Sequence, residues 1–242
     1  MPTSQTSSAP SSWPFRLLVV VIALALWFGT QWLIGQRQLE GEGIVDIPHG
    51  WTASIHEYLQ SHAAAADSLL IVSSAVIDGL GIFLLAWSVF GRSVRPLVGL
   101  LLLFSMRQIC QGLCALPAPP GMIWPDGVVR LAPRLPDFLG GWQVPSLLVT
   151  YKVANDFFFS GHTALAVYGA VELARLGRRP LVVLAWVIAL FQVFVVIILR
   201  AHWTMDVVAG ALAALLAAGL AAQIAPWCDR WIARLSGRLA SG

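Results

Sequence analysis

The sequence predicts an all-α integral membrane protein with six transmembrane helices in one bundle and both termini in the cytoplasm. Three observations predict this fold class. The chain of 242 residues is 58% hydrophobic and only 11% charged, whereas a soluble domain has about 25% charged residues. Apolar runs of about 20 residues, which are long enough to cross a bilayer, occur six times. The basic residues are also distributed unevenly between the loops that join these runs.

The six expected helices span about residues 15–35, 67–90, 96–116, 160–177, 180–200 and 204–226. They take up more than half of the chain, so we expect one membrane domain over residues 13–228. A disordered polar tail is expected at 1–12 and a short basic cytoplasmic tail at 229–242. The first apolar run is too long for a typical signal peptide and lacks a small-residue cleavage site. We therefore expect it to be retained as a helix.

The orientation of the helices follows from the positions of lysine and arginine. Nine of the 15 basic residues lie on one side of the predicted bundle: Arg16, Arg92, Arg95, Arg175, Arg178, Arg179, Arg230, Arg234 and Arg238. The other six are Arg37, Arg107, Arg130, Arg134, Lys152 and Arg200. The positive-inside rule places the richer side in the cytoplasm and the two long loops, 36–66 and 117–159, on the outer (periplasmic, extracellular or lumenal) face. The net charge of +3 is thus a topology signal, and we expect no nucleic-acid partner.

The first outer loop contains Trp51, Ile55 and Leu59 at helical spacing, which predicts a short interfacial helix. Its three histidines, His49, His56 and His62, are interpreted as solvated interfacial side chains. No cluster of cysteine and histidine has the spacing of metal ligands, so we expect neither a metal nor another cofactor. The second outer loop is rich in proline, glycine and tryptophan, and loops of that length are usually functional.

The segment "DFFFSGHT", residues 156–163, opens the fourth expected helix. Ser160 is a typical N-cap, and Gly161 allows another group to approach closely. The free N–H groups and the dipole at a helix N-terminus attract an anion, and His162 stands beside that position. Taken alone, the segment is also explained by a capped helix start with an interfacial histidine.

The second cluster, "HWTMD", links the fifth and sixth helices. His202 and Asp206 are spaced i, i+4 and share one helical face. A carboxylate that accepts from one ring nitrogen fixes the histidine tautomer and leaves the other nitrogen as a base or nucleophile. An interfacial ion pair is the alternative. Because both clusters are expected at the outer ends of adjacent helices, a shared catalytic site is favoured.

The two motifs "DFFFSGHT" and "HWTMDVV" resemble the type-2 phosphatidic acid phosphatase superfamily and, within it, the sphingomyelin synthases. The resemblance covers about residues 45–225. It includes the six-helix layout, an arginine in the third helix (Arg107) followed by "LPAPPGM", and an aspartate shortly before "SGHT" (Asp156). The phosphatase branch has an arginine six residues before the second histidine. Val196 occupies that position here, which argues against an ordinary phosphatase.

The resemblance implies phosphoryl transfer in two steps. His202, oriented by Asp206, attacks the phosphorus of a phospholipid headgroup and becomes a phosphohistidine. His162 protonates the departing diacylglycerol oxygen and then activates the acceptor. The expected substrate-binding residues are Ser160, Gly161, Asp156, Arg107, Lys152, Arg200 and Asp78. Asp78 is included because an intramembrane carboxylate is a functional candidate by default, although a packing role is equally open.

The expected activity is transfer of a phospho-headgroup from a glycerophospholipid to a lipid hydroxyl acceptor such as ceramide or diacylglycerol. With water as the acceptor, the protein would be a lipid phosphate phosphatase or a phospholipase C-like hydrolase. A non-enzymatic transporter is the third class. It predicts polar residues spread through several helices, whereas here they gather at the outer end, with Asp78 the main exception. The expected partners are a membrane phospholipid donor and a lipid acceptor, and the oligomeric state, a homo-oligomer included, is left open.

Overall fold

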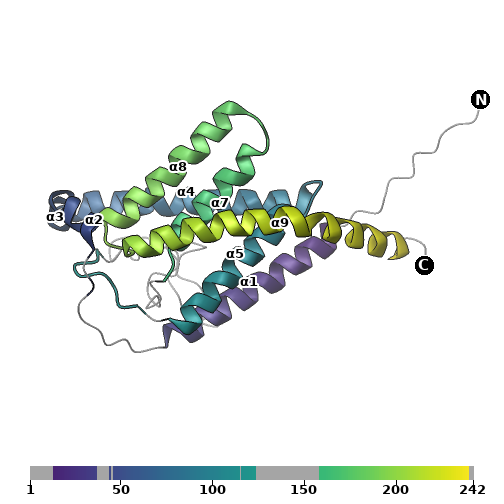
Figure 1. Cartoon of the computed structure of the whole chain (residues 1–242), viewed down its shortest axis with the longest axis horizontal. Coiled ribbons are helices and arrows are strands. Elements are labelled where there is room, and N and C mark those ends of the chain that lie inside the picture. Colours follow the sequence, from purple (N-terminus) through teal and green to yellow (C-terminus); the bar gives the residue numbers. More distant parts are fainter. Residues whose placement is uncertain (1–12, 37–43, 45, 115, 124–157, 240–242) are drawn as a thin grey trace, which may run out of the picture.

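The computed structural model describes residues 13–36, 44, 46–114, 116–123 and 158–239, and within them the chain forms helices and no strands (Figure 1). The elements are α1 (Trp13–Gly35), α2 (Ile47–Trp51), α3 (Ala53–Ser61), α4 (Ala63–Phe90), α5 (Arg95–Leu113), α7 (Gly161–Ala174), α8 (Arg179–Ile198) and α9 (Thr204–Leu239). The predicted all-α class is confirmed for these residues.

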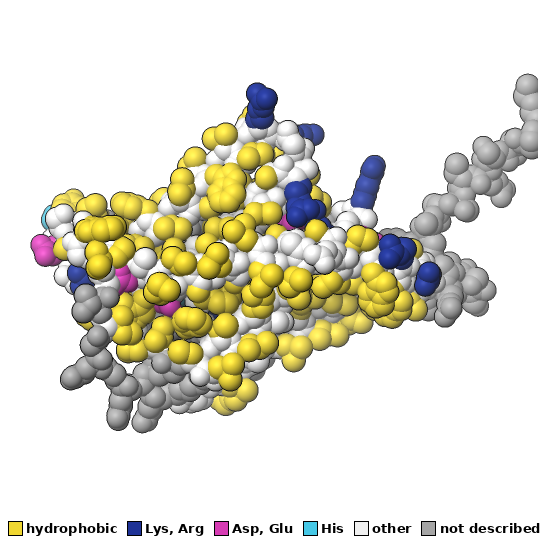
Figure 2. All heavy atoms as spheres, viewed as in Figure 1, with side chains coloured by type: hydrophobic (Ala, Val, Ile, Leu, Met, Phe, Trp, Pro, Cys, Tyr) yellow, Lys and Arg dark blue, Asp and Glu magenta, His cyan; other side chains and the backbone are white. Residues whose placement is uncertain are grey.

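Five of the described helices are long and apolar enough to cross a membrane. These spans are Trp13–Leu33, Ala63–Phe90, Arg95–Leu113, Arg179–Ile198 and Thr204–Ser236. Many of their large hydrophobic side chains are exposed, and yellow apolar side chains cover most of the face in Figure 2. A soluble protein would not expose so much apolar surface, so the structure indicates a multi-pass membrane protein.

The sixth expected helix is present as α7, but it is shorter than the expected span over 160–177. Its 14 residues extend about 21 Å, against a hydrocarbon core of about 30 Å. Ten of the 14 residues are buried, because α4, α5, α8 and α9 all contact this helix. The apolar composition of α7 therefore reflects burial in protein, and composition alone does not distinguish this from burial in lipid.

The bundle has two different ends. We call one the histidine end; it holds α2, α3 and the starts of α7 and α9. The other, the arginine end, holds the α4–α5 and α7–α8 connections and the start of α1, where Arg16 Nη1 donates to the Gly91 carbonyl at 2.6 Å. On the face shown in Figure 2, dark blue basic side chains lie mainly toward the arginine end and acidic ones mainly at the histidine end.

Helix α9 continues beyond the boundary expected at residue 228. It passes through Pro226 without ending and runs to Leu239, so most of the predicted basic tail is helical. Asp229 lies in this extension and accepts hydrogen bonds from the Val94 backbone N–H at 2.8 Å and the Ser93 hydroxyl at 2.7 Å. The extension therefore helps to fix the start of α5.

Candidate active site

The start of α7 has the capped geometry that its sequence predicts. Ser160 is fully buried, and its Oγ accepts a hydrogen bond from the Thr163 backbone N–H at 3.3 Å. Its own backbone N–H donates to the Asp206 carbonyl oxygen at 2.9 Å. The two histidine motifs are thus joined directly through their backbones, although 40 residues separate His162 from His202.

Two glycines permit close approaches at the start of α7, one by α9 and one by Arg107. A Cβ atom at Gly210 of α9 would lie 2.6 Å from the Ser160 carbonyl oxygen, which is too close for any other residue. A Cβ atom at Gly161 would lie 3.2 Å from Nε of Arg107. The space at Gly161 was predicted from the sequence. Gly210 was not, since a glycine within a run of alanines in a membrane helix carries no local signal of a contact.

Arg107 of α5 lies at the N-terminus of α7. Its side chain is 8% exposed, and Nε donates to the Phe159 carbonyl oxygen at 3.3 Å. The guanidinium also lies over the Trp27 ring, 5.5 Å from the centroid, within the range of a cation–π contact. A buried cation beside a helix N-terminus creates a place where a negative group is stabilised twice, by the charge and by the dipole.

The two histidines lie together, as the sequence predicts. His162 and His202 are each 8% exposed, and both His202 and the Arg107 guanidinium lie close enough to the His162 ring to interact with it electrostatically. Two imidazoles, one guanidinium and one helix N-terminus therefore meet in a nearly enclosed place. This combination supplies two groups that can attack or move a proton and two that can bind an anion.

The Asp206 carboxylate is fully buried and contacts both His202 and Trp203. Its Oδ2 lies 3.7 Å from Nδ1 of His202 and accepts a hydrogen bond from the Trp203 backbone N–H at 2.9 Å. The first distance is an ion-pair distance and longer than a direct hydrogen bond. The second contact caps the first turn of α9, in the manner of a capping box. Asp206 therefore has a structural role that the i, i+4 spacing did not reveal.

Asp46 and His49 hold the His202 segment from outside, and neither was among the site residues expected from the sequence. The Asp46 carboxylate accepts from the Thr204 backbone N–H at 2.5 Å and from the Thr204 hydroxyl at 2.7 Å. His49 Nε2 donates to the His202 carbonyl at 3.0 Å, and its ring stacks on Trp203 at 5.8 Å. "DIPHG" does carry a signal, since an N-cap Asp with a Pro in the first helical turn is a typical helix start, but its partners lie more than 150 residues away.

Asp46 and His49 together form a clamp on the His202 segment, and the surroundings of the clamp shift the pKa of both side chains. Burial lowers the pKa of His49, and this effect outweighs the nearby Asp46 charge, so the ring is held neutral while Nε2 donates. Burial raises the pKa of Asp46, but the hydrogen bonds from Thr204 and from the His49 backbone N–H outweigh it and hold the pKa below its usual value. The expectation of solvated histidines is wrong for His49 and His56, which are 6% and 1% exposed; His56 Nδ1 donates to the Ile198 carbonyl at 2.8 Å.

The segment 116–123, "LPAPPGMI", folds back over the α8–α9 junction. Trp203 Nε1 donates to the Pro117 carbonyl at 2.8 Å, and Arg200 Nη1 donates to the Pro120 carbonyl at 2.8 Å. Gly121 has a φ of 76° and packs against Arg200 and His56. The structure thus places Arg200, expected to bind substrate, in a contact with the chain itself. The Trp203 side chain is likewise held by a contact with the chain itself.

Asp78 is not brought to this place. Asp78 lies in the middle of α4 and is partly buried. Leu80, two residues on, packs against Gly169, about two turns beyond Gly161 along α7, so Asp78 lies deeper in the bundle than the histidines. Lys152 and Asp156 lie outside the described residues. In the described part of the chain, no group of three or more His, Cys, Asp and Glu side chains is arranged to hold a metal ion.

Comparison with known proteins agrees with the site in its general chemistry. Residues 123–230 match the family model described as the PAP2 superfamily. The matched range contains both histidine motifs and leaves out α1 to α5, and with them Arg107, Asp46 and His49. A search of curated proteins and a search of solved structures gave no match. Members of the PAP2 superfamily are phosphatases and phosphotransferases, which confirms the predicted class of enzyme. The second half of the chain, with its paired histidines, is thus similar to the PAP2 superfamily.

Proposed function

We propose that the protein transfers a phospho-headgroup from a glycerophospholipid to a lipid hydroxyl through a phosphohistidine at His202. The observation that carries this proposal is the meeting of His162, His202 and Arg107 at the N-terminus of α7. One group has to attack, a second has to move protons, and a third has to bind the phosphoryl oxygens. The site supplies one side chain for each task.

In the first step, Nε2 of His202 attacks the phosphorus, since Nδ1 faces Asp206. An N–P bond forms and the P–O bond to diacylglycerol breaks. The leaving oxygen takes a proton from His162. Arg107 and the N–H groups at the start of α7 bind the phosphoryl oxygens, whose negative charge they stabilise.

In the second step, His162 takes a proton from the acceptor hydroxyl. The acceptor oxygen attacks the phosphorus and the N–P bond breaks, which returns His202 to its starting state. Asp206 stabilises the positive charge that develops on His202 in both steps. A lipid hydroxyl as acceptor gives a transferase. Water gives a lipid phosphate phosphatase or a phospholipase C-like hydrolase, and the similarity to a superfamily with both activities keeps this as the second candidate.

The lipid acceptor is preferred because of two sequence features, the resemblance to the sphingomyelin synthases and Val196 in place of the phosphatase arginine. The test is incubation of the purified protein with a panel of phospholipids labelled in the headgroup, with and without ceramide or diacylglycerol. We expect the label to appear in a new lipid only when an acceptor is present. Release of a water-soluble phosphate ester or of inorganic phosphate without any acceptor would identify the hydrolase instead.

We also propose that the histidine end faces the outer side of the membrane, because the nine basic residues of the richer side include those of the arginine end. In a variant without the native cysteines, Ser54→Cys on the exposed side of α3 should react with an impermeant thiol reagent added outside intact cells. Leu176→Cys, at the other end, should react only after lysis. The opposite labelling would place the site in the cytoplasm.

A further inference from the structure

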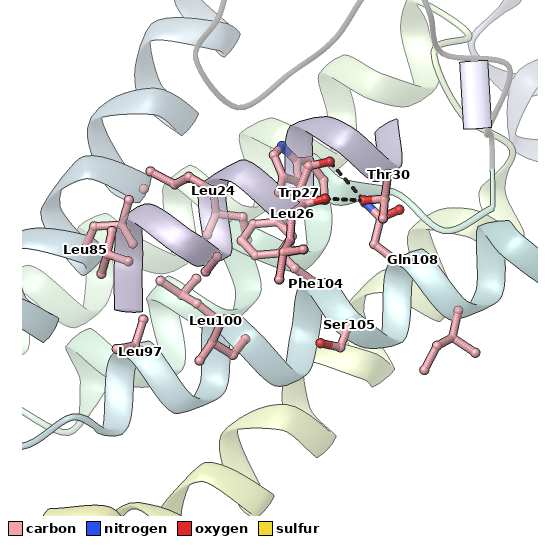
Figure 3. A pocket seen from close by; sticks show the side chains of 16 residues that line it. Leu24, Leu26, Trp27, Thr30, Leu85, Leu97, Leu100, Phe104, Ser105 and Gln108 are labelled. Carbon is pink, nitrogen blue, oxygen red and sulfur yellow. Dashed lines mark hydrogen bonds between the residues drawn. The ribbon is translucent and has the colours of Figure 1, made fainter. Parts of the chain in front are cut away.

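An elongated apolar cavity runs between α1, α4, α5 and α7 (Figure 3). Its volume is about 470 Å³, within the range of about 300–1,000 Å³ that ligand sites occupy. Along α5 its wall extends from Leu97 to Ile109, a distance of about 18 Å. Nearly all lining side chains are aliphatic or aromatic, and the polar ones, Thr30, Ser105 and Gln108, lie toward one end of the cavity.

That end of the cavity adjoins the candidate active site. Leu165 lines the cavity and lies on α7 one turn beyond Gly161. Trp27 also lines it, and the same ring lies against the Arg107 guanidinium at 5.5 Å. Gln108 follows Arg107 in the chain. A molecule that filled the cavity would therefore have one end beside the Arg107 guanidinium, which we expect to bind the phosphoryl group.

The other side of the cavity reaches the surface. Leu26 and Ile109 line it and are 66% and 60% exposed, so it is open between α1 and α5. Of the five membrane spans in the described residues, α1 is the least enclosed. In its most apolar 18-residue stretch 11% of the residues are buried, against 39% in each of the other four spans. A chain can therefore enter sideways from the lipid phase without passing through water.

We propose that this cavity binds one hydrocarbon chain of the lipid substrate whose phosphoryl group lies at Arg107 and the start of α7. The assignment rests on the proposed function, since that substrate supplies the chain. The cavity walls are no more apolar than lipid tails, so moving a chain from bilayer to cavity gives little hydrophobic free energy. Its role is to fix the position of the headgroup, and small displacements of reacting groups cost about 100-fold in rate.

The test compares two alanines of the same helix. Ala23 lines the cavity, whereas Ala25 is exposed and does not line it. In the full-length protein in lipid nanodiscs, Ala23→Phe should fill the cavity and lower kcat/KM for a long-chain phospholipid about 10- to 100-fold. Turnover of a short-chain analogue with the same headgroup, which does not reach into the cavity, should change less than about twofold. Ala25→Phe should leave both substrates unaffected.

A second variant guards against a loss that is due only to misfolding of Ala23→Phe, and a second readout detects the bound chain without any turnover. Ser105→Phe narrows the cavity from α5 and should act as Ala23→Phe does. A phospholipid with a photoreactive group at the end of one chain should label peptides of α1 and α5 in wild-type protein and lose that labelling in Ala23→Phe.

Equal loss for short and long chains, no loss for either, or labelling confined to other helices would overturn the assignment. If the wild-type protein turns over the lipid and only the chain-length response is missing, the proposed function stands and the cavity assignment alone fails. If photolabelling maps to the cavity but no lipid is turned over, the cavity assignment stands and the proposed function fails.

Discussion

The two ends of the bundle both bury charged side chains, but they pair them differently. At the arginine end, Glu172 is fully buried and its Oε2 accepts from Nε and Nη2 of Arg95 at 3.0 and 2.5 Å. Tyr168 of the same helix donates to the Pro96 carbonyl at 3.2 Å. These opposite charges meet directly, and each contact ties one helix to another.

At the histidine end the groups that meet are two imidazoles and a guanidinium, and the carboxylate of Asp206 stays 3.7 Å from His202. The excess is of groups that are positive or can become positive, gathered at a helix N-terminus. This arrangement is unfavourable by itself and becomes favourable when an anion binds. Burial of charge by itself therefore does not point to a functional site, whereas the gathering of like-signed groups around a helix start favours the histidine end as the candidate site.

The largest effect should come from Asp206→Asn, because Asp206 supports the charge that develops on His202. We expect kcat to fall by about 10²–10⁴. Asn can still accept from the Trp203 N–H, so the cost in stability should be no more than about 1 kcal/mol. Asp229→Asn, on the same helix at the arginine end, is the matched control and should lower stability but keep turnover per folded molecule. Equal activities of the two variants would contradict the comparison.

The converse experiment removes a charge at the arginine end. Arg95→Gln leaves Glu172 buried without its main partner, which should cost about 3–5 kcal/mol in the free energy of unfolding. Thermal unfolding of the purified protein measures this, and Arg92→Gln, an exposed arginine in the same connection, should have almost no effect. Turnover by the molecules that remain folded should match wild type. A specific loss of kcat in Arg95→Gln would show that this end also takes part in the chemistry.

A third experiment separates the two motifs at the histidine end. Gly210→Ala places a methyl group against the Ser160 carbonyl and should push the start of α9 away from α7. Since displacements of about 1 Å can cost about 100-fold, we expect kcat to fall by that order. Gly219→Ala, also on α9 but with open space around it, should be neutral or slightly stabilising. If both variants retain full activity, the two histidines do not depend on this contact.

The sequence predicted those parts of the molecule that local patterns encode. The all-α class followed from the apolar runs, and the meeting of His162 with His202 followed from two motifs expected at one depth. The burial of α7 in protein could not be predicted, because the partner of its buried Glu172 is Arg95, 77 residues earlier in the chain. The clamp formed by Asp46 and His49 and the contact of Arg200 with Pro120 also depend on distant partners. Hydrophobic periodicity does not report such contacts.

The smallest effect concerns the clamp on His202. The pKa of His49 is lower in the folded protein than in the unfolded chain, so the unfolded chain binds more protons in this range. The stability that neutral His49 contributes is therefore complete above about pH 6.5 and is lost as the pH falls through the folded pKa. His49→Gln, which can still donate to the His202 carbonyl, should reduce the decrease in Tm between pH 7 and pH 5. If Tm decreases as much in His49→Gln as in wild type, His49 does not take up a proton when the protein unfolds.

The central claim, that His202 becomes covalently phosphorylated, is tested most directly by trapping the intermediate. His162→Ala protein, incubated with a phospholipid whose leaving group is activated and needs no acid, should accumulate an adduct because no base then drives its breakdown. Peptide mapping should place an acid-labile, base-stable phosphoryl group on His202, and His202→Asn should abolish it. A phosphoryl group on His162 of the wild-type protein, or turnover within a few-fold of wild type in His202→Asn, would contradict the claim.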